Sequence, residues 1–129
     1  LSFSNFGTSG ELRTDRIEEA VSIARELDPD LIIDGPMQAD TALVPDIQKD
    51  YPFMSFDGPA NVLICPNLAS ANIAYKLLQR IAGAEMTGPI LEGLSRPAHV
   101  LQRGDSVRDV VHMAAICAVD AQRHARQRL

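Results

Sequence analysis

Apolar residues recur at three- and four-residue spacing in several parts of the chain, which is typical of helices with one buried face. The spacing predicts a helix over residues 14–27 and a long helix that opens at Ser106. Between them, another helix is predicted to start at Asn67 or Ser70 and to stop at Gly83. The apolar positions of these helices are Ile17, Ala20, Val21, Ala24, Leu27, Ile73, Leu77, Leu78, Ile81, Val107, Val110, Val111, Ala114, Ala118 and Ala121.

The segments between these helices contain a further helical stretch and several short apolar runs. Residues 39–49 have a helical pattern that we expect to bend or break near Pro45. The apolar runs are continuous instead of alternating, as in strands buried on both faces. They are Leu1–Ser4, Leu31–Ile33, Val62–Cys65, Pro89–Leu91 and His99–Leu101. Strands that alternate with helices predict the α/β class, with a mostly parallel sheet flanked by helices.

Composition narrows the class of protein further. An apolar content of 46% and a charged content of 22% are those of a soluble globular domain. No apolar run approaches the roughly 20 residues that span a bilayer, so we expect a cytoplasmic protein without a membrane partner. A net charge of −5 disfavours a nucleic-acid surface. Cys65 and Cys117 are expected to be free thiols, and no His, Cys or Asp spacing predicts a metal site.

Polar residues follow the predicted strands, where parallel sheets bind their ligands. Asp34 and Gln38 come just after one strand, and Gln102 and Arg103 come just after another. We therefore predict that these four residues belong to a binding site for an anionic small molecule.

The segment from Arg103 to Asp109 carries the most chemistry. Arg103 precedes Gly104, and Ser106 then opens the long helix, where the first backbone N–H groups attract anions. The alternative is a capping box, in which Ser106 caps the helix and Asp109 bonds back to it. The capping box leaves Arg103 unexplained, and the sequence alone leaves both interpretations open.

Segments along nearly the whole chain resemble the phosphate acetyl/butyryltransferase family. The matching stretches are Leu1–Ser4, Ile33–Asp40, Ala60–Ile64, Asn72–Arg80, Gly83–Ile90 and Arg103–Asp109. Other details resemble one branch of the family, the phosphotransacetylase-like C-terminal domain of bacterial NADP-dependent malic enzymes. They are Ser4–Gly7, Asp40–Pro45, Asp50–Phe53 and Val119–Gln122.

The resemblance implies a fold of the isocitrate/isopropylmalate dehydrogenase type, in a larger two-domain unit that is usually dimeric. Residues 1–129 would form the C-terminal part of this domain, which agrees with a chain that begins without methionine at what we interpret as the end of a strand. We therefore expect a fragment that forms part of a homo-oligomer.

The resemblance also implies roles for particular residues. Family enzymes move an acetyl group between phosphate and the thiol of coenzyme A. An arginine holds phosphate and an aspartate takes the thiol proton, and Arg103 and Asp109 occupy these positions. A serine that stabilises the developing charge is replaced here by Gln102. Loss of one such donor typically lowers the rate by a factor on the order of 10²–10³.

Three hypotheses follow from the sequence. The first is a regulatory domain of a malic enzyme that binds acetyl-CoA, or a related acyl or phosphate ligand, without catalysing transfer. Gln102, Arg103, Ser106, Asp34 and Gln38 would bind the ligand. NADP and a divalent metal would belong to the malic enzyme portion, and this chain would bind no cofactor. The alternatives are an active phosphate acetyltransferase, with Arg103 and Asp109 as catalytic residues, and an oligomerisation module.

Overall fold

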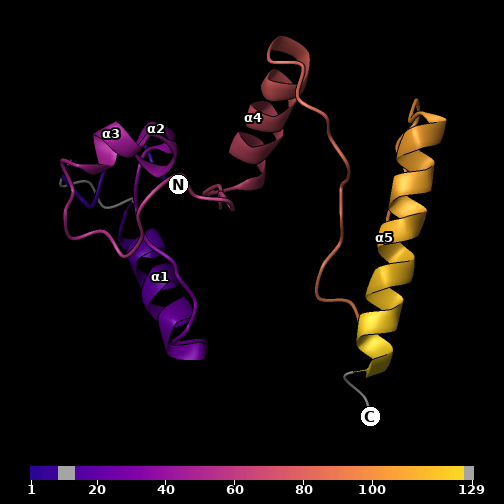
Figure 1. The fold of residues 1–129 in the computed structure, drawn as a ribbon, viewed down its shortest axis with the longest axis horizontal. Coiled ribbons are helices and arrows are strands. Elements are labelled where there is room, and N and C mark those ends of the chain that lie inside the picture. Colours follow the sequence, from indigo (N-terminus) through magenta and orange to yellow (C-terminus); the bar gives the residue numbers. More distant parts are fainter. Residues whose placement is uncertain (9–13, 127–129) are drawn as a thin grey trace. The chain divides into compact units, whose positions relative to one another are not determined.

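The described residues contain five helices and divide into two compact units. The computed structural model describes residues 1–8 and 14–126. The units are Leu1–Lys76 and Leu77–Leu129, and α4 crosses the boundary between them. The helices are α1 (Asp15–Leu27), α2 (Ala39–Leu43), α3 (Pro45–Gln48), α4 (Leu68–Ile81) and α5 (Val107–Arg126) (Figure 1).

The helices agree closely with those predicted from the sequence. The chain enters α1 at Thr14, and Ser106 immediately precedes α5. The stretch over 39–49 is divided as expected, because α2 ends before Val44 and Pro45 begins α3. Proline lacks an N–H group, so it fits the first position of a new helix better than the interior of a continuous one.

The apolar runs expected to be strands are extended, but no sheet joins them within the described residues. Strands need neighbours with continuous hydrogen-bond ladders, whereas these segments make isolated bonds. Ser2 N–H donates to Met37 O at 2.7 Å, and the Leu1 nitrogen donates to Ile64 O at 2.5 Å. The expected mostly parallel sheet is therefore not confirmed by the described residues, which are helical with extended connections.

In the first unit, the beginning of the chain runs beside residues 36–38. Phe6 N–H donates to Pro36 O at 2.7 Å. The Asn5 carboxamide bonds Gln38 twice: its oxygen accepts from Gln38 N–H at 2.7 Å, and its nitrogen donates to Gln38 Oε1 at 3.2 Å. Met37 is buried, as are Val21 of α1 and Ala42 of α2. Polar bonds and a small apolar core together fix this corner of the unit.

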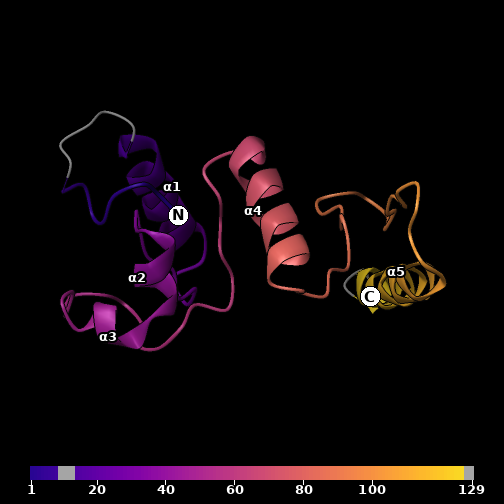
Figure 2. The same ribbon diagram turned by 90° about the horizontal axis from the view of Figure 1, so that it is seen from above.

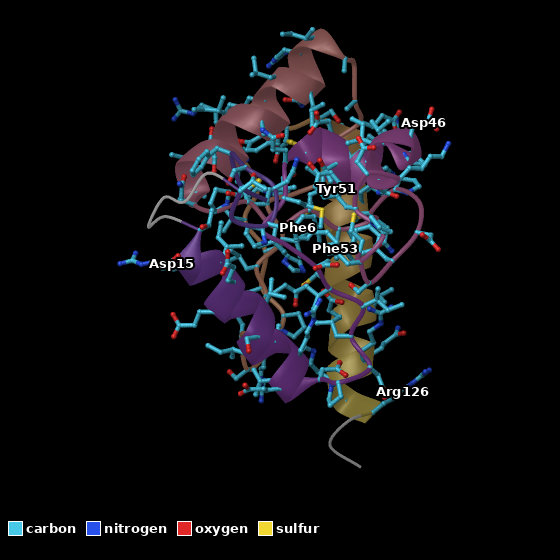
Figure 3. The ribbon with its side chains drawn as sticks, turned by 90° about the vertical axis from the view of Figure 1, so that its left-hand side faces the viewer. Phe6, Asp15, Asp46, Tyr51, Phe53 and Arg126 are labelled. Atoms are coloured by element: carbon cyan, nitrogen blue, oxygen red, sulfur yellow. The ribbon has the colours of Figure 1, made fainter. Side chains whose placement is uncertain are left out.

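Three aromatic side chains gather in the same unit (Figure 3). The ring of Phe6 lies 5.3 Å from that of Tyr51 and 4.8 Å from that of Phe53, between ring centres. The Tyr51 hydroxyl accepts a hydrogen bond from Asn5 Nδ2 at 3.0 Å. Such tilted and edge-on rings attract each other beyond the gain from burial alone.

Gln48 ties α2 and α3 to the following loop. Its side-chain amide donates to the carbonyl oxygens of Thr41 and Gly58, each at 3.0 Å, and its oxygen accepts from Gly58 N–H at 3.0 Å. The residue is only 8% exposed, so water cannot easily replace these bonds. One buried amide thus satisfies several backbone groups that no helix or strand pairs.

In the second unit, α5 packs against extended chain. The chain that precedes α5 runs beside the helix toward its first turn (Figure 1), and Figure 2 views α5 along its axis. The Cys117 sulfur lies 3.8 Å from Pro97 O, and Met113 on α5 is 4% exposed. Both cysteines are free, as the sequence predicted. None of the described helices combines the length and apolarity needed to cross a membrane.

The Gln48 network predicts a local loss of stability on substitution. Gln48→Ala leaves buried carbonyl and N–H groups unsatisfied, which should cost about 1–3 kcal/mol. Hydrogen exchange measured by mass spectrometry should then show faster exchange over residues 40–60. Lys49→Ala is the matched control, because it removes an exposed ion pair to Asp46 and should change exchange little. Equal effects of the two substitutions would contradict this role of Gln48.

Candidate functional site

The predicted Gln102–Arg103 segment forms a tight turn before α5. Asp105 closes the turn: its Oδ2 accepts from Gln102 N–H at 2.6 Å, and its own N–H donates to Gln102 O at 3.1 Å. Gly104 has a φ of +96°, in the left-handed region that favours glycine. The turn therefore depends on Asp105 and Gly104, and it presents Gln102 and Arg103 as exposed residues.

Ser106 and Asp109 form the reciprocal hydrogen bonds of a capping box at the start of α5. Ser106 N–H donates to Asp109 Oδ2 at 2.8 Å, and Asp109 N–H donates to Ser106 Oγ at 3.2 Å. The Ser106 hydroxyl also donates to Asp109 Oδ2 at 2.7 Å. Of the two interpretations of this motif, the capping box is thus present. The capping box is compatible with a ligand. Both bonds that Ser106 donates end on Asp109 Oδ2, so neither of them uses the other carboxylate oxygen, Oδ1.

The capping box also sets the electrostatics of Asp109. The hydrogen bonds from the Ser106 hydroxyl, and then from its backbone N–H, lower the pKa of Asp109 below the ordinary value for aspartate. These bonds favour the charged form because both groups donate to the carboxylate. Asp109 is therefore a carboxylate at neutral pH, and it can accept further hydrogen bonds.

A polar pocket of about 210 Å³ lies beside this helix start. Asp109 and His112 of α5 line it together with Thr87. Glu85 and Arg108 also line the pocket. They form a bidentate ion pair, in which the two guanidinium nitrogens lie 2.9 and 2.8 Å from the two carboxylate oxygens. The pocket thus combines a carboxylate, an imidazole and a guanidinium on one unit of the chain.

The predicted site residues are divided between the two compact units. Ser106 and Asp109 line the pocket, whereas the adjacent turn residues Gln102 and Arg103 are not among its lining residues. Asp34 and Gln38 belong to the other compact unit. The assignment of ligand-binding and catalytic roles to these residues stays a prediction.

Asp34 and Gln38 are held by their own unit. Asp34 Oδ2 accepts from Ser55 N–H at 2.7 Å, and its Oδ1 lies 3.4 Å from Arg25 Nη2. Gln38 Nε2 donates to Phe3 O at 2.8 Å, in addition to the bonds with Asn5. Both polar side chains therefore stabilise loops that the sequence placed just after a strand.

The sequence motifs did not reveal two contacts between polar side chains of the second unit. One is Glu85 with Arg108, and the other joins His99 Nε2 to Asp120 Oδ2 at 3.4 Å. Each joins positions far apart in the sequence, so no local motif marks it. Within residues 1–8 and 14–126, no group of three or more His, Cys, Asp or Glu side chains could hold a metal ion.

The chain belongs to a family of acyltransferases. The family model described as phosphate acetyl/butaryl transferase matches residues 1–118. The match covers almost the entire chain, including the turn, the capping box and the pocket beside α5.

Two kinds of protein are found among its relatives. A phosphate acetyltransferase of Acetivibrio thermocellus is 48% identical over 123 residues, 95% of this chain and 37% of that protein. An NADP-dependent malic enzyme of Salmonella typhimurium is 45% identical over 125 residues, 95% of this chain and 16% of that protein.

A solved structure is similar over the same extent. The EutD phosphotransacetylase from Staphylococcus aureus has a TM-score of 0.82 and 34% identity, and the match covers 95% of this chain and 38% of that one. The chain thus spans little more than a third of the phosphotransacetylases it matches. It spans a smaller part of the malic enzyme.

The capping box predicts a measurable change in the ionisation of Asp109. Ser106→Ala removes the hydroxyl that contributes most to the lowered pKa, so the pKa of Asp109 should rise toward its ordinary value. A group with a lowered pKa stabilises the fold above its unfolded pKa, and this stabilisation is lost as pH falls through the folded pKa. A carboxyl-carbon NMR titration measures the shift, and Ser106→Thr, which keeps the hydroxyl, should leave the pKa low. An unchanged pKa in Ser106→Ala would contradict the assignment.

Proposed function

We propose that this chain is part of a phosphotransacetylase-like regulatory domain of an NADP-dependent malic enzyme. It binds acetyl-CoA, or a related acyl or phosphate ligand, and does not catalyse acyl transfer. Binding alters the oxidative decarboxylation of malate to pyruvate elsewhere in the same protein. The observation that carries the proposal is the turn before α5, where Arg103 is retained and Gln102 replaces the expected serine.

The local chemistry supports anion binding at this place. The turn ends at the first N–H groups of α5, which carry partial positive charge. Arg103 is exposed in the turn, so its guanidinium can pair with a phosphate or carboxylate through two hydrogen bonds. Asp109 lies one helical turn further along and is charged, so it suits a thiol or another hydrogen-bond donor better than a second anion.

The same geometry argues against efficient catalysis. A serine hydroxyl in the position of Gln102 would offer a compact donor to a developing oxyanion. The glutamine amide is longer and places its N–H groups elsewhere, so the charge would be poorly stabilised. Binding needs the arginine and the helix start, whereas turnover also needs this donor.

The relatives support the malic enzyme branch. Besides the Salmonella protein, an NADP-dependent malic enzyme of Escherichia coli is 43% identical over 125 residues. In that setting the chain would be one region of a larger cytoplasmic protein, and NADP and a divalent metal would be bound by the malic enzyme portion. The ligands of this chain would be small molecules, without nucleic acid or membrane.

We further propose that the extended segments become strands of a mostly parallel sheet when the rest of the domain is present. The fold would then be of the isocitrate/isopropylmalate dehydrogenase type, in a homo-oligomer such as a dimer. Exposed apolar side chains support this proposal, among them Ile32, Ile64 and Val100 on the extended segments. Large apolar surfaces of this kind normally face a sheet partner or another subunit. Oligomerisation would then be a second role of the same faces.

The alternative function is an active phosphate acetyltransferase. It is favoured by the names of most of the relatives and by the retained Arg103 and Asp109. The two functions differ in whether acetyl groups are transferred at a useful rate.

Arg103 should control ligand binding in the complete protein. Arg103→Ala removes a charge-assisted pair, so the affinity for acetyl-CoA should fall by about 10- to 100-fold in isothermal titration calorimetry. Any effect of acetyl-CoA on malate oxidation, measured as NADPH formation, should fall in parallel. Arg96→Ala, at another exposed arginine of the same unit, is the matched control. If acetyl-CoA neither binds nor affects malate oxidation in the unaltered protein, the proposed regulation is wrong.

Gln102 should limit acyl transfer. Gln102→Ser restores the missing donor and should raise transfer from acetyl phosphate to coenzyme A by a factor on the order of 10²–10³. Loss of the free thiol of coenzyme A measures this rate, and Gln102→Ala controls for removal of the bulky amide alone. A high rate in the unaltered protein, without further gain in Gln102→Ser, would support the alternative function.

A further inference from the structure

The imidazole of His99 is a buried titratable group that the proposed function does not use. Its side chain is only 4% exposed. Nδ1 accepts a hydrogen bond from Leu91 N–H, with 3.3 Å between the two nitrogens. A ring nitrogen that accepts cannot carry a hydrogen, so in the neutral ring the hydrogen lies on Nε2. Leu91 thus selects one tautomer of His99.

The other side of the ring faces α5. His99 Nε2 lies 3.4 Å from Asp120 Oδ2. The Nε2 atom is fully buried and lacks a hydrogen bond, a condition it shares among the described residues with Thr41 Oγ1 alone. A buried N–H group is costly unless an acceptor compensates it, and the Asp120 carboxylate lies close enough to offer this compensation. The imidazole therefore links Leu91, the segment 97–102 and the middle of α5.

This link restricts the turn that precedes α5. Gln102 lies three positions after His99, and extended chain advances about 3.3 Å per residue, so the turn begins within about 10 Å of His99 along the chain. At its other end the turn is closed by Asp105 and joined to α5 through the capping box of Ser106 and Asp109. Arg103 is therefore held between two fixed points, one on each side along the chain.

We propose that His99 is a positioning residue, which places Arg103 for ligand binding through its contacts with Leu91 and Asp120. The role in binding rests on the proposed function, whereas the fixing of the turn does not. The contacts of His99 go to Leu91 and Asp120, so it acts on Arg103 through the geometry of the segment 99–103. Its influence on binding should then require Arg103.

A double-mutant cycle in the complete protein tests this requirement, with acetyl-CoA as the probe. His99→Phe keeps a ring of similar size but loses both nitrogens, and it should weaken binding by about tenfold. In an Arg103→Ala background the same substitution should change binding by less than about twofold. An equal loss of affinity in both backgrounds would mean a general structural role and would overturn the proposal.

Conservative variants separate the contributions of the two partners. His99→Asn keeps an acceptor for Leu91 N–H but cannot reach Asp120, and Asp120→Asn keeps the acceptor oxygen while removing the charge. If the link to α5 positions Arg103, Asp120→Ala should weaken binding as much as His99→Phe, and Asp120→Asn should restore most of it. Binding that is insensitive to Asp120→Ala would overturn the role of this contact.

Two measurements test the inference without any ligand. Long-range proton–nitrogen NMR spectra of protein with labelled histidine should show the Nε2–H form of His99, assigned by its loss in His99→Phe. Hydrogen exchange at the amides of Gln102 and Asp105 should become faster in His99→Phe. If acetyl-CoA does not bind at all, the proposed function fails, but these results still decide the positioning of the turn. An Nδ1–H form with unchanged exchange would overturn it.

Discussion

The hydrogen bonds between Ser106 and Asp109 set the first residue of α5, and much of the second unit depends on that starting point. They satisfy backbone N–H groups that would otherwise lack partners at the helix start. They also keep the Asp109 carboxylate charged beside the positive end of the helix dipole. Successive helix positions lie about 100° apart around the axis, so a cap at a neighbouring residue would join the preceding turn to α5 at a different point around the helix. The capping box therefore fixes how this turn meets the helix that carries Asp109, His112 and Asp120.

The sequence predicted the helices well because their signals are local. The apolar spacing of α1, α4 and α5 lies within each segment, and Pro45 marks the break between α2 and α3. A strand is different, since its hydrogen bonds go to another segment. The run 31–33 has the β-branched and apolar composition of a strand, yet the described residues provide it with no ladder. Composition alone therefore predicted extended chain correctly but could not establish a sheet.

The same distinction explains how much of the candidate site could be foreseen. The capping box of Ser106 and Asp109 is a local motif, so the sequence alone suggested it, together with the second interpretation of the same residues as an anion site. The pairs Glu85–Arg108 and His99–Asp120 form because the chain before α5 folds back against this helix. The spacing of residues along the sequence does not predict such a contact. A weak signal did exist for the second pair. His99 and Asp120 each interrupt an apolar stretch, and a polar residue in such a place usually has a buried partner.

Exposed apolar side chains on α4 and α5 suggest how the candidate site before α5 could be regulated. Leu68 and Val107 are each 82% exposed, at the start of α4 and of α5. Burial of apolar surface stabilises a protein by about 25 cal/mol per square ångström. Exposed apolar faces therefore favour binding of a partner that covers them. A partner that packs on α5 could shift the helix that carries Asp109. Through the contact of Asp120 with His99, it could also shift the segment that leads to Arg103. Ligand binding at the turn and packing on α5 would then be coupled. A ligand that binds one position of the turn more tightly would favour the packing on α5 that stabilises this position, and the packing would favour the ligand by the same factor.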